Sequence, residues 1–231
     1  MPTVLVTGAN RGLGLEFTRQ YAAAGWRVLA TCRTPDGAPA LDRVAAEHGD
    51  RIAIHRLDVD DRASVDALAA GLGESAIDLL LNNAGTAGKR PFDFGAIDYA
   101  DWARTLAINT LAPLRVIEAL VDAVGRSERR VIATLSSRMG SIGENDSGGA
   151  YAYRSSKAAL NAALKSLAID LARRRIVVVA LHPGWVATDM GGDKAPLSPT
   201  ESVTGLRRVI EDLGAADTGR FLSYDGDEIA W

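Results

Sequence analysis

The segment that decides the fold lies at the start of the chain and reads Val4-Leu5-Val6-Thr7-Gly8-Ala9-Asn10-Arg11-Gly12-Leu13-Gly14. An apolar run enters a glycine-rich turn, and a pattern of helical period follows at once. Glycine lacks a Cβ, so such a turn can bend sharply and approach a ligand closely. The helix after it begins with free N–H groups and the positive end of its dipole, which suit a phosphate. We therefore predict a strand–turn–helix unit that binds a pyrophosphate.

The glycine spacing is T-G-x-x-x-G-x-G rather than the G-x-G-x-x-G of the commonest dinucleotide-binding turn. Standing alone, such a turn could equally be a connection that only closes a strand–helix unit. Its place at the first strand–helix turn favours cofactor binding, because dinucleotides bind there in doubly wound sheets. The residues that we assign to this turn are Gly8, Asn10, Arg11, Gly12, Leu13 and Gly14.

The rest of the chain alternates between short apolar runs and longer helical patterns. Strands are predicted at 3–6, 27–32, 51–57, 77–82, 129–136, 176–181 and 220–223. Helices are predicted at 13–24, 63–72, 99–124, 151–174 and 199–213. Runs of Val, Ile and Leu without polar alternation are typical of parallel strands covered on both faces. We predict a single Rossmann-like α/β domain over 1–231, with about seven parallel strands and the ligand site at their carboxyl edge.

Composition excludes several classes of protein and site. The formal charge is −3, which leaves no basic field for nucleic acid. No apolar run approaches the ~20 residues of a membrane span, and the start of the chain reads as a strand rather than a basic leader. One cysteine and three scattered histidines offer little to a zinc ion. We expect a cytoplasmic protein with no metal, nucleic-acid or membrane partner.

The second predicted strand bears on which nicotinamide cofactor is bound. It ends Cys32-Arg33-Thr34, where an acidic residue would accept a hydrogen bond from a ribose 2′-OH and favour NAD. Arg33 stands there instead, and Arg11 in the glycine turn can point to the same region. Two guanidinium groups fit a 2′-phosphate in charge and geometry. The sequence therefore favours NADP(H) over NAD(H), unless both arginines are merely solvated surface residues.

Polar residues follow the third and fourth strands. Asp58 can accept a hydrogen bond from an adenine amino group, whereas Asp60 or Asp61 fits a cap of the next helix. The amides of Asn82 and Asn83 can either tie neighbouring strands together or contact the cofactor. The further cofactor residues that we assign here are Asp58, Val59, Asn83, Ala84 and Gly85.

Residues able to do chemistry gather in the second half of the chain. Tyr153 and Lys157 are spaced i, i+4 and share a helix face. A nearby ammonium would lower the phenol pKa from about 10, although an exposed Tyr–Lys pair is the plain alternative. Ser137, at the end of the fifth strand, can donate to a carbonyl oxygen on which charge builds. Asn109, inside an apolar helix, either holds a water linking Lys157 to solvent or is a satisfied core amide.

These motifs resemble the short-chain dehydrogenase/reductase family over nearly the whole chain. Stretches 135–142, 147–154 and 183–192 resemble more closely its C-factor/sniffer-like group of carbonyl reductases. The resemblance implies that Ser137 polarises a carbonyl, Tyr153 transfers the proton and Lys157 binds the nicotinamide ribose and tunes Tyr153. It also implies that Asn109 completes a proton relay. The residues that it adds to the cofactor site are Pro183, Gly184, Val186 and Thr188, with Tyr153 and Lys157 themselves.

The expected substrate is a ketone or aldehyde with a hydrophobic body, or the corresponding alcohol. Ser137 and Tyr153 lie further apart than in compact family members, and we place the extra residues within 143–149. The loop 88–94 is expected nearby. The substrate residues that we assign are Met139, Ile142, Tyr151, Trp185 and Met190, although ordinary loop packing would also explain them.

The resemblance implies a homodimer or homotetramer formed by the helices 99–124 and 157–174. Packing of their apolar faces on the chain's own sheet is the alternative. A different class of function is a dinucleotide-binding signalling or scaffold protein. The set Asn109, Ser137, Tyr153 and Lys157 favours an oxidoreductase, because a pure binding protein needs no such set.

Overall fold

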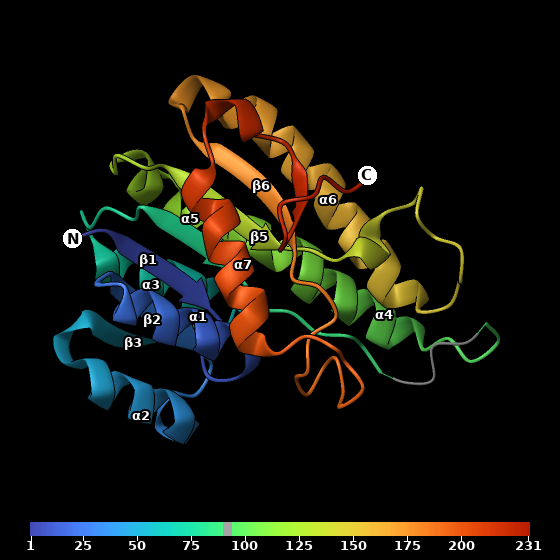
Figure 1. Ribbon diagram of the computed structural model, residues 1–231, viewed down its shortest axis with the longest axis horizontal. Helices are drawn as coiled ribbons and strands as arrows, with labels where there is room; N and C mark the ends of the chain where they lie inside the picture. The colour runs from blue at the N-terminus through green and yellow to red at the C-terminus, as the bar shows by residue number, and fades with distance from the viewer. Residues whose placement is uncertain (90–93) are drawn as a thin grey trace.

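The computed structural model describes residues 1–89 and 94–231 and contains one seven-stranded parallel sheet (Figure 1). Its strand order is β3-β2-β1-β4-β5-β6-β7. The order reverses direction beside β1, which is the point where doubly wound sheets open a crevice. The strands are β1 (Thr3–Thr7), β2 (Arg27–Cys32), β3 (Ile52–Arg56), β4 (Leu79–Asn82), β5 (Val131–Leu135), β6 (Val177–His182) and β7 (Phe221–Ser223). The predicted fold is confirmed.

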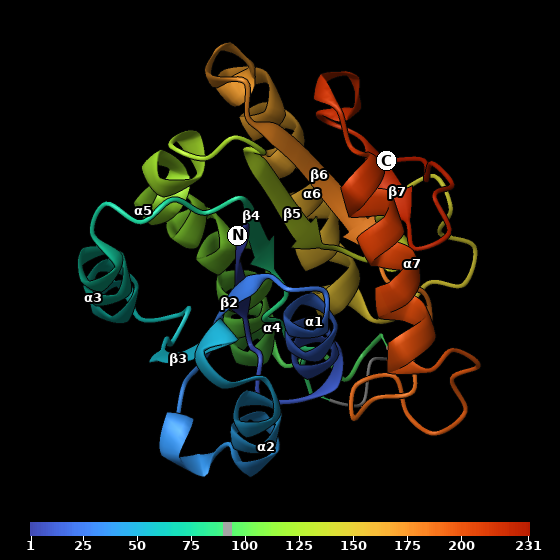
Figure 2. The same ribbon diagram turned by 60° about the vertical axis from the view of Figure 1, so that its left-hand side comes forward.

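Helices cover both faces of the sheet (Figures 1 and 2). Helices α1, α2 and α7 pack on one face, and α3, α5 and α6 pack on the other. The helices are α1 (Gly12–Ala23), α2 (Pro39–His48), α3 (Arg62–Leu72), α4 (Tyr99–Leu106), α5 (Ala112–Gly125), α6 (Tyr151–Leu171) and α7 (Pro199–Asp212). Helix α2 is additional to the predicted ranges. It buries only Leu41 and Val44, so its periodic signal is weak.

Each strand supplies side chains to two cores. In β1, Val4 and Val6 pack with Phe17 of α1, whereas Leu5 packs with Leu160 of α6. All five of these side chains are fully buried. Because both faces are covered, polar residues have no exposed side to occupy, which is why the strands read as continuous apolar runs.

The predicted helix 99–124 is wrong in one respect, because it is interrupted. Helix α4 passes into a π-helical turn, Ala107–Leu111, before α5 begins. Pro113 lacks the N–H that would donate to the carbonyl of Asn109 in an α-helix, so the regular ladder cannot run through this point. The wider turn carries the buried Asn109, and π turns often mark functional sites.

No helix among the residues that the structure describes is both long and apolar enough to cross a membrane.

Candidate active site

An open cleft of about 760 Å³ runs along the carboxyl ends of the strands. It is the crevice expected beside the point where the strand order reverses. A second hollow, of about 790 Å³, lies between α7 and the turn after β7 and contains none of the predicted residues. The predicted cofactor residues that line the cleft are Gly8, Asn10, Arg11, Gly12, Leu13, Gly14, Arg33, Asp58, Val59, Asn83, Ala84, Gly85, Tyr153, Lys157, Pro183 and Thr188.

The remaining two predicted cofactor residues do not line this cleft. Val186 is buried and pairs with Leu197 in an isolated β-bridge. Gly184 has φ +82°, and a Cβ there would lie 2.9 Å from Leu197 and 3.2 Å from Tyr224. Both residues shape the loop that presents Pro183 and Thr188.

The glycine turn folds tightly against the start of α1. Gly8 and Gly12 have positive φ values, +69° and +53°. A Cβ on Gly14 would lie 2.1 Å from the carbonyl oxygen of Gly8 and 2.6 Å from Nδ2 of Asn83, so only glycine fits. Helix α1 has no side-chain cap at its N-terminus. The first N–H groups of α1 therefore receive no hydrogen bond acceptor from the capping residue. They are left for a ligand such as a pyrophosphate.

Asn83 ties β4 to β1. Its Nδ2 donates to the carbonyl of Thr7, at 2.8 Å, and to that of Gly8, at 3.2 Å. The hydroxyl of Thr7 accepts from the backbone N–H of Asn83 and of Ala84. The strand-tying alternative thus describes Asn83 well. Thr7, the threonine of the T-G-x-x-x-G-x-G turn, is the other half of the tie, although we assigned it no role from the sequence.

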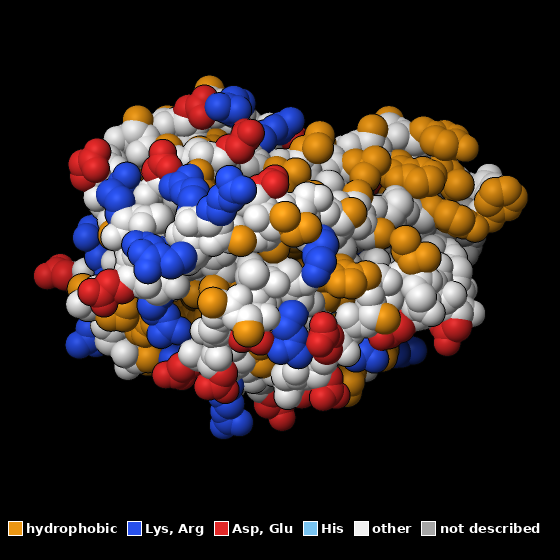
Figure 3. Space-filling model, turned by 90° about the horizontal axis from the view of Figure 1, so that it is seen from above, with side chains coloured by type: hydrophobic (Ala, Val, Ile, Leu, Met, Phe, Trp, Pro, Cys, Tyr) orange, Lys and Arg blue, Asp and Glu red, His pale blue; other side chains and the backbone are white. Residues whose placement is uncertain are grey.

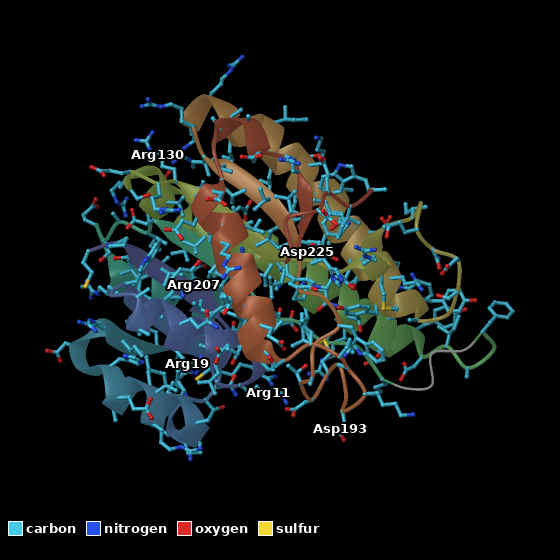
Figure 4. All side chains as sticks on the ribbon, in the orientation of Figure 1. Arg11, Arg19, Arg130, Asp193, Arg207 and Asp225 are labelled. Atoms are coloured by element: carbon cyan, nitrogen blue, oxygen red, sulfur yellow. The ribbon has the colours of Figure 1, made fainter. Side chains whose placement is uncertain are left out.

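The two arginines assigned to the 2′-phosphate lie in different environments. Arg11 forms an ion pair with Asp189 of the loop after β6, at 2.7 Å, and both side chains are exposed. Figure 4 shows Arg11 beside that loop, which also carries Asp193. Arg33 lines the cleft and has no ion pair among the described residues. Its guanidinium is therefore the one left open to an anion.

The three aspartates after β3 have different contacts, which separates the helix-capping role from the cofactor-binding role. Asp61 caps α3 by accepting the N–H of Ala63, at 3.0 Å. Asp60 lies 3.6 Å from Arg115 instead. The Asp58 carboxylate accepts the N–H of Asp60 at 3.2 Å and lines the cleft. The capping role therefore belongs to Asp61, and Asp58 keeps its place in the cleft.

Three serines near the end of β5 compete for the role of carbonyl donor. Ser136 donates its hydroxyl proton to the amide oxygen of Asn161, at 2.5 Å. Ser141 lies 3.4 Å from the carbonyl of Trp231. The Ser137 oxygen accepts the N–H of Met139, at 3.2 Å, which leaves its own proton available to a ligand. This arrangement supports the choice of Ser137.

Lys157 lies beneath Tyr153 and is buried. Its Nζ donates to the carbonyl of Leu135, at 2.8 Å, and lies 5.9 Å from the centroid of the Tyr153 ring. The turn after β5 packs directly on this lysine, because a Cβ on Gly140 would lie 2.8 Å from Cβ of Lys157. The structure therefore brings the end of β5 and the Tyr–Lys pair together.

Burial controls the protonation of this pair. It lowers the pKa of Lys157 to about 8 and raises the pKa of Tyr153, while the neighbouring Ser137 hydroxyl opposes the rise. Burial outweighs the neighbouring groups here, and the lowering of the Tyr153 pKa by Lys157 stays a prediction for the cofactor-bound site. The Lys157 ammonium lies against the face of the Tyr153 ring and donates to the carbonyl of Leu135. Desolvation of the phenolate therefore dominates the pKa of Tyr153. Tyr153 is consequently protonated at neutral pH.

The Asn109 amide is satisfied by the protein. Its Oδ1 accepts the N–H of Thr86, and its Nδ2 donates to the Thr86 carbonyl, both at 2.8 Å, and to Ser156 at 3.0 Å. This is the core-amide alternative. A Cβ on Gly85 would lie 3.2 Å from Oδ1 of Asn109 and 3.9 Å from Nζ of Lys157, so Gly85 separates the two. Asn109 therefore fixes the loop that lies over the lysine.

Comparison with known proteins agrees with this geometry. The sequence model of the short chain dehydrogenase family matches residues 2–197. The chain belongs to the short-chain dehydrogenase family. It is 48% identical to the C-signal protein of Myxococcus xanthus over 165 residues, which are 71% of this chain and 99% of that protein.

Solved structures give the same result. The carbonyl reductase Sniffer of D. melanogaster has a TM-score of 0.93 and 37% identity over 100% of both chains. An NADPH-bound carbonyl reductase from chicken fatty liver also has a TM-score of 0.93 and 37% identity, over 100% of this chain and 99% of that one. The similarity to the sniffer-like group of short-chain dehydrogenases is confirmed.

The predicted substrate wall of this short-chain dehydrogenase is only partly assembled around the cleft. Of its five residues, Met190 lines the cleft. Ile142 is 78% exposed, and Trp185 donates its Nε1 proton to the carbonyl of Gly191, at 2.9 Å. Met139 and Tyr151 are half-buried and lie outside the cleft lining. Residues 90–93 of the loop expected nearby lie outside the described residues.

Tyr151 belongs to an aromatic cluster instead. Its ring lies 6.4 Å from that of Trp102 and 6.2 Å from that of Phe94. Trp102 in turn stacks on Tyr99 and donates to the hydroxyl of Ser155, at 2.8 Å. Figure 3 shows hydrophobic side chains gathered at the end of the molecule that carries α4 and the start of α6 in Figure 1. Cleft residues that the sequence did not lead us to assign include Thr86, Asp101, Arg104, Thr105 and Ile108. Gly88 and Lys89, from the loop expected nearby, also line the cleft.

Proposed function

We propose that the chain is an NADP(H)-dependent oxidoreductase that reduces a ketone or aldehyde to an alcohol, or catalyses the reverse reaction. Tyr153 is the proton donor or acceptor. The observation that carries the proposal is that one cleft is lined by residues of two kinds. The glycine turn and Arg33 are suited to binding a cofactor, and Tyr153 and Lys157 are suited to proton transfer. A protein that only binds the cofactor would not need the Tyr153–Lys157 pair.

The cofactor end fits a dinucleotide phosphate. The uncapped start of α1 and the Cβ-free surface at Gly14 suit a pyrophosphate. Arg33 suits a 2′-phosphate, because its guanidinium lines the cleft unpaired among the described residues. Carbonyl reductases of similar structure have been solved with NADP or NADPH bound. When bound, this cofactor supplies or accepts the hydride.

The chain's own residues handle the proton and the developing charge. In the direction of reduction, the Tyr153 hydroxyl gives its proton to the carbonyl oxygen, forming the alcohol. The raised pKa suits this direction because it keeps the phenol protonated. Ser137 donates a hydrogen bond to the same oxygen as negative charge builds there. Lys157 binds the nicotinamide ribose and, as a cation in a dry site, stabilises the phenolate left behind.

The substrate class is argued from two apolar residues of the cleft. Met190 and Ile108 line the cleft and favour a hydrophobic body on the carbonyl compound. The expected homodimer or homotetramer is supported by Leu111 and Ile169, large apolar side chains that are 48% and 68% exposed on the helices assigned to the interface.

The test is NADPH oxidation with a panel of aromatic and aliphatic ketones and aldehydes. Wild type should reduce members of the panel, and Tyr153→Phe should lose at least about a hundredfold in kcat, because it removes the transferred proton. Tyr99→Phe, on the exposed start of α4, is the matched control and should behave as wild type. Full activity of Tyr153→Phe, or no turnover of any carbonyl compound by wild type, would overturn the proposal.

A further inference from the structure

His182 ends strand β6 beside the turn that carries Ser137. Its Nδ1 accepts the backbone N–H of Arg138, at 3.3 Å. On the other side of Ser137, the backbone N–H of Ser136 donates to the carbonyl of Leu181, at 2.7 Å. Ser137 is therefore flanked on both sides by residues whose backbone N–H groups bond to the end of β6.

The N–H of Arg138 finds its acceptor in a side chain, because the regular pairing of β5 with β6 has ended before it. The β5–β6 ladder runs from Val131 opposite Val177 to Leu135 opposite Leu181. Beyond it, Arg138 enters a 3₁₀ turn. The carbonyl of Pro183, the residue after His182, accepts the hydroxyl of Ser202 instead, at 2.6 Å. The imidazole of His182 thus supplies the acceptor for Arg138 in place of a backbone carbonyl.

An imidazole accepts at Nδ1 only when that nitrogen carries no proton. Burial lowers the pKa of His182 to about 4, and the charge of Arg138 acts in the same direction. Asp225, on the turn after β7 and labelled in Figure 4, opposes them. Arg138 forms an ion pair with Glu144, with 3.6 Å between Nη1 and Oε2. His182 is consequently neutral at pH 7, with its proton on Nε2.

The Ser137 hydroxyl depends on the same turn. Its oxygen accepts the N–H of Met139, the residue after the one that His182 holds. If the N–H of Arg138 lost its acceptor, the segment would lose its bond to β6 on the C-terminal side of Ser137. The packing of Gly140 on Lys157 would remain, but the Ser137 hydroxyl would be placed less firmly.

We propose that His182 is a positioning residue, whose Nδ1 fixes the Ser137 hydroxyl beside Tyr153 by holding the backbone of Arg138. This inference rests on the proposed function, because the role of Ser137 belongs to it. His182 touches neither substrate nor cofactor in this scheme, because it acts on the backbone of Arg138. Its effect should therefore appear in the chemical step and leave cofactor affinity unchanged.

The test compares three substitutions of His182. Asparagine can place its Oδ1 where Nδ1 now lies, glutamine places its oxygen further out, and leucine has no acceptor. His182→Leu and His182→Gln should lose about tenfold to a hundredfold in kcat with a carbonyl substrate, because a displacement of about 1 Å can have that effect. His182→Asn should remain within about threefold of wild type, and KM and the NADPH Kd should stay nearly constant in all three. His55→Asn, on β3 and away from the cleft, is the control.

A second measurement reports on the anchor without using activity. Hydrogen exchange at the amide of Arg138 should be faster in His182→Leu and His182→Gln than in wild type and in His182→Asn. If wild type reduces carbonyl compounds but kcat and this exchange rate are unchanged in both the leucine and glutamine variants, the inference is overturned and the proposed function stands. If wild type turns over no carbonyl compound, the proposed function fails. Unchanged exchange at Arg138 would then also overturn the anchoring role.

Discussion

Gly14→Ala should abolish tight binding of NADPH while leaving the fold in place. The added Cβ would lie 2.1 Å from the carbonyl oxygen of Gly8, whereas ordinary contact begins at 3.4 Å. Subtracting the two distances shows that the turn must open by roughly 1.3 Å. The tie from Asn83 Nδ2, 2.6 Å from the same Cβ position, must shift as well.

A displacement of this size moves the backbone N–H groups that face the pyrophosphate. Misplacement by about 1 Å commonly lowers function a hundredfold. We therefore expect the NADPH Kd to rise about a hundredfold, which corresponds to about 2.7 kcal/mol. Overpacking should also lower the free energy of unfolding by about 1–3 kcal/mol.

The assay is a fluorescence titration of NADPH, with thermal unfolding measured on the same samples. Gly71→Ala is the matched control, because Gly71 lies inside α3 and a Cβ there would meet nothing within 4 Å. This control should bind NADPH normally and gain about 0.5–1 kcal/mol in stability, as expected for alanine over glycine in a helix. Wild-type affinity in Gly14→Ala would refute the idea that the turn cradles the cofactor.

Further predictions concern the charged residues around the cleft. Arg33→Ala should weaken NADPH binding about tenfold or more and leave NADH affinity unchanged, because only NADPH carries the 2′-phosphate. The control Arg43→Ala, on α2, should change neither affinity. Equal losses of affinity for both cofactors would show that Arg33 does not bind the 2′-phosphate. Lys157→Met should abolish activity yet raise the melting temperature at pH 7. The lowered pKa of Lys157 means that burying its charge reduces the free energy of unfolding by about 3 kcal/mol, which the bond to the Leu135 carbonyl offsets only in part. The charged form predominates below the folded pKa of about 8, so the gain should shrink as pH rises from 8 toward 10.5; a constant gain would contradict this origin. Arg154→Ala should speed amide hydrogen exchange across 139–148, because the Arg154 guanidinium bonds to Met139, Ser147 and Gly148. Arg154→Lys should restore little of the protection, because an ammonium cannot reach all three acceptors. Unchanged exchange in the alanine variant would show that Arg154 does not hold this loop.

Local chemistry explains why much of the architecture was predictable. The order of strands and helices follows from apolar runs that must be buried on both faces, as Leu5 and Val6 illustrate by facing opposite cores. The glycine turn was predictable because positive φ at Gly8 and the contact at Gly14 admit no other residue. The i, i+4 spacing of Tyr153 and Lys157 placed them on one helix face without any tertiary information.

Properties that depend on neighbours distant in sequence could not be read in the same way. The interruption of the helix 99–124 had a local signal in Pro113, but the partners of Asn109 come from Thr86 and Ser156, on other elements. The substrate wall was predicted from residue type alone. Tyr151 instead packs with Trp102, because two helices meet there in space.

The sequence by itself determined the doubly wound sheet, the glycine turn after β1 and the placing of Tyr153 and Lys157 on one helix face, because each rests on steric or periodic rules within a short stretch of chain. Only the tertiary structure decided the protonation of Tyr153, the pairing of Arg11 with Asp189 and the anchoring of Arg138 by His182. Desolvation and hydrogen bonding depend on which atoms surround a group after folding, and those atoms come from strands and loops far apart in the sequence.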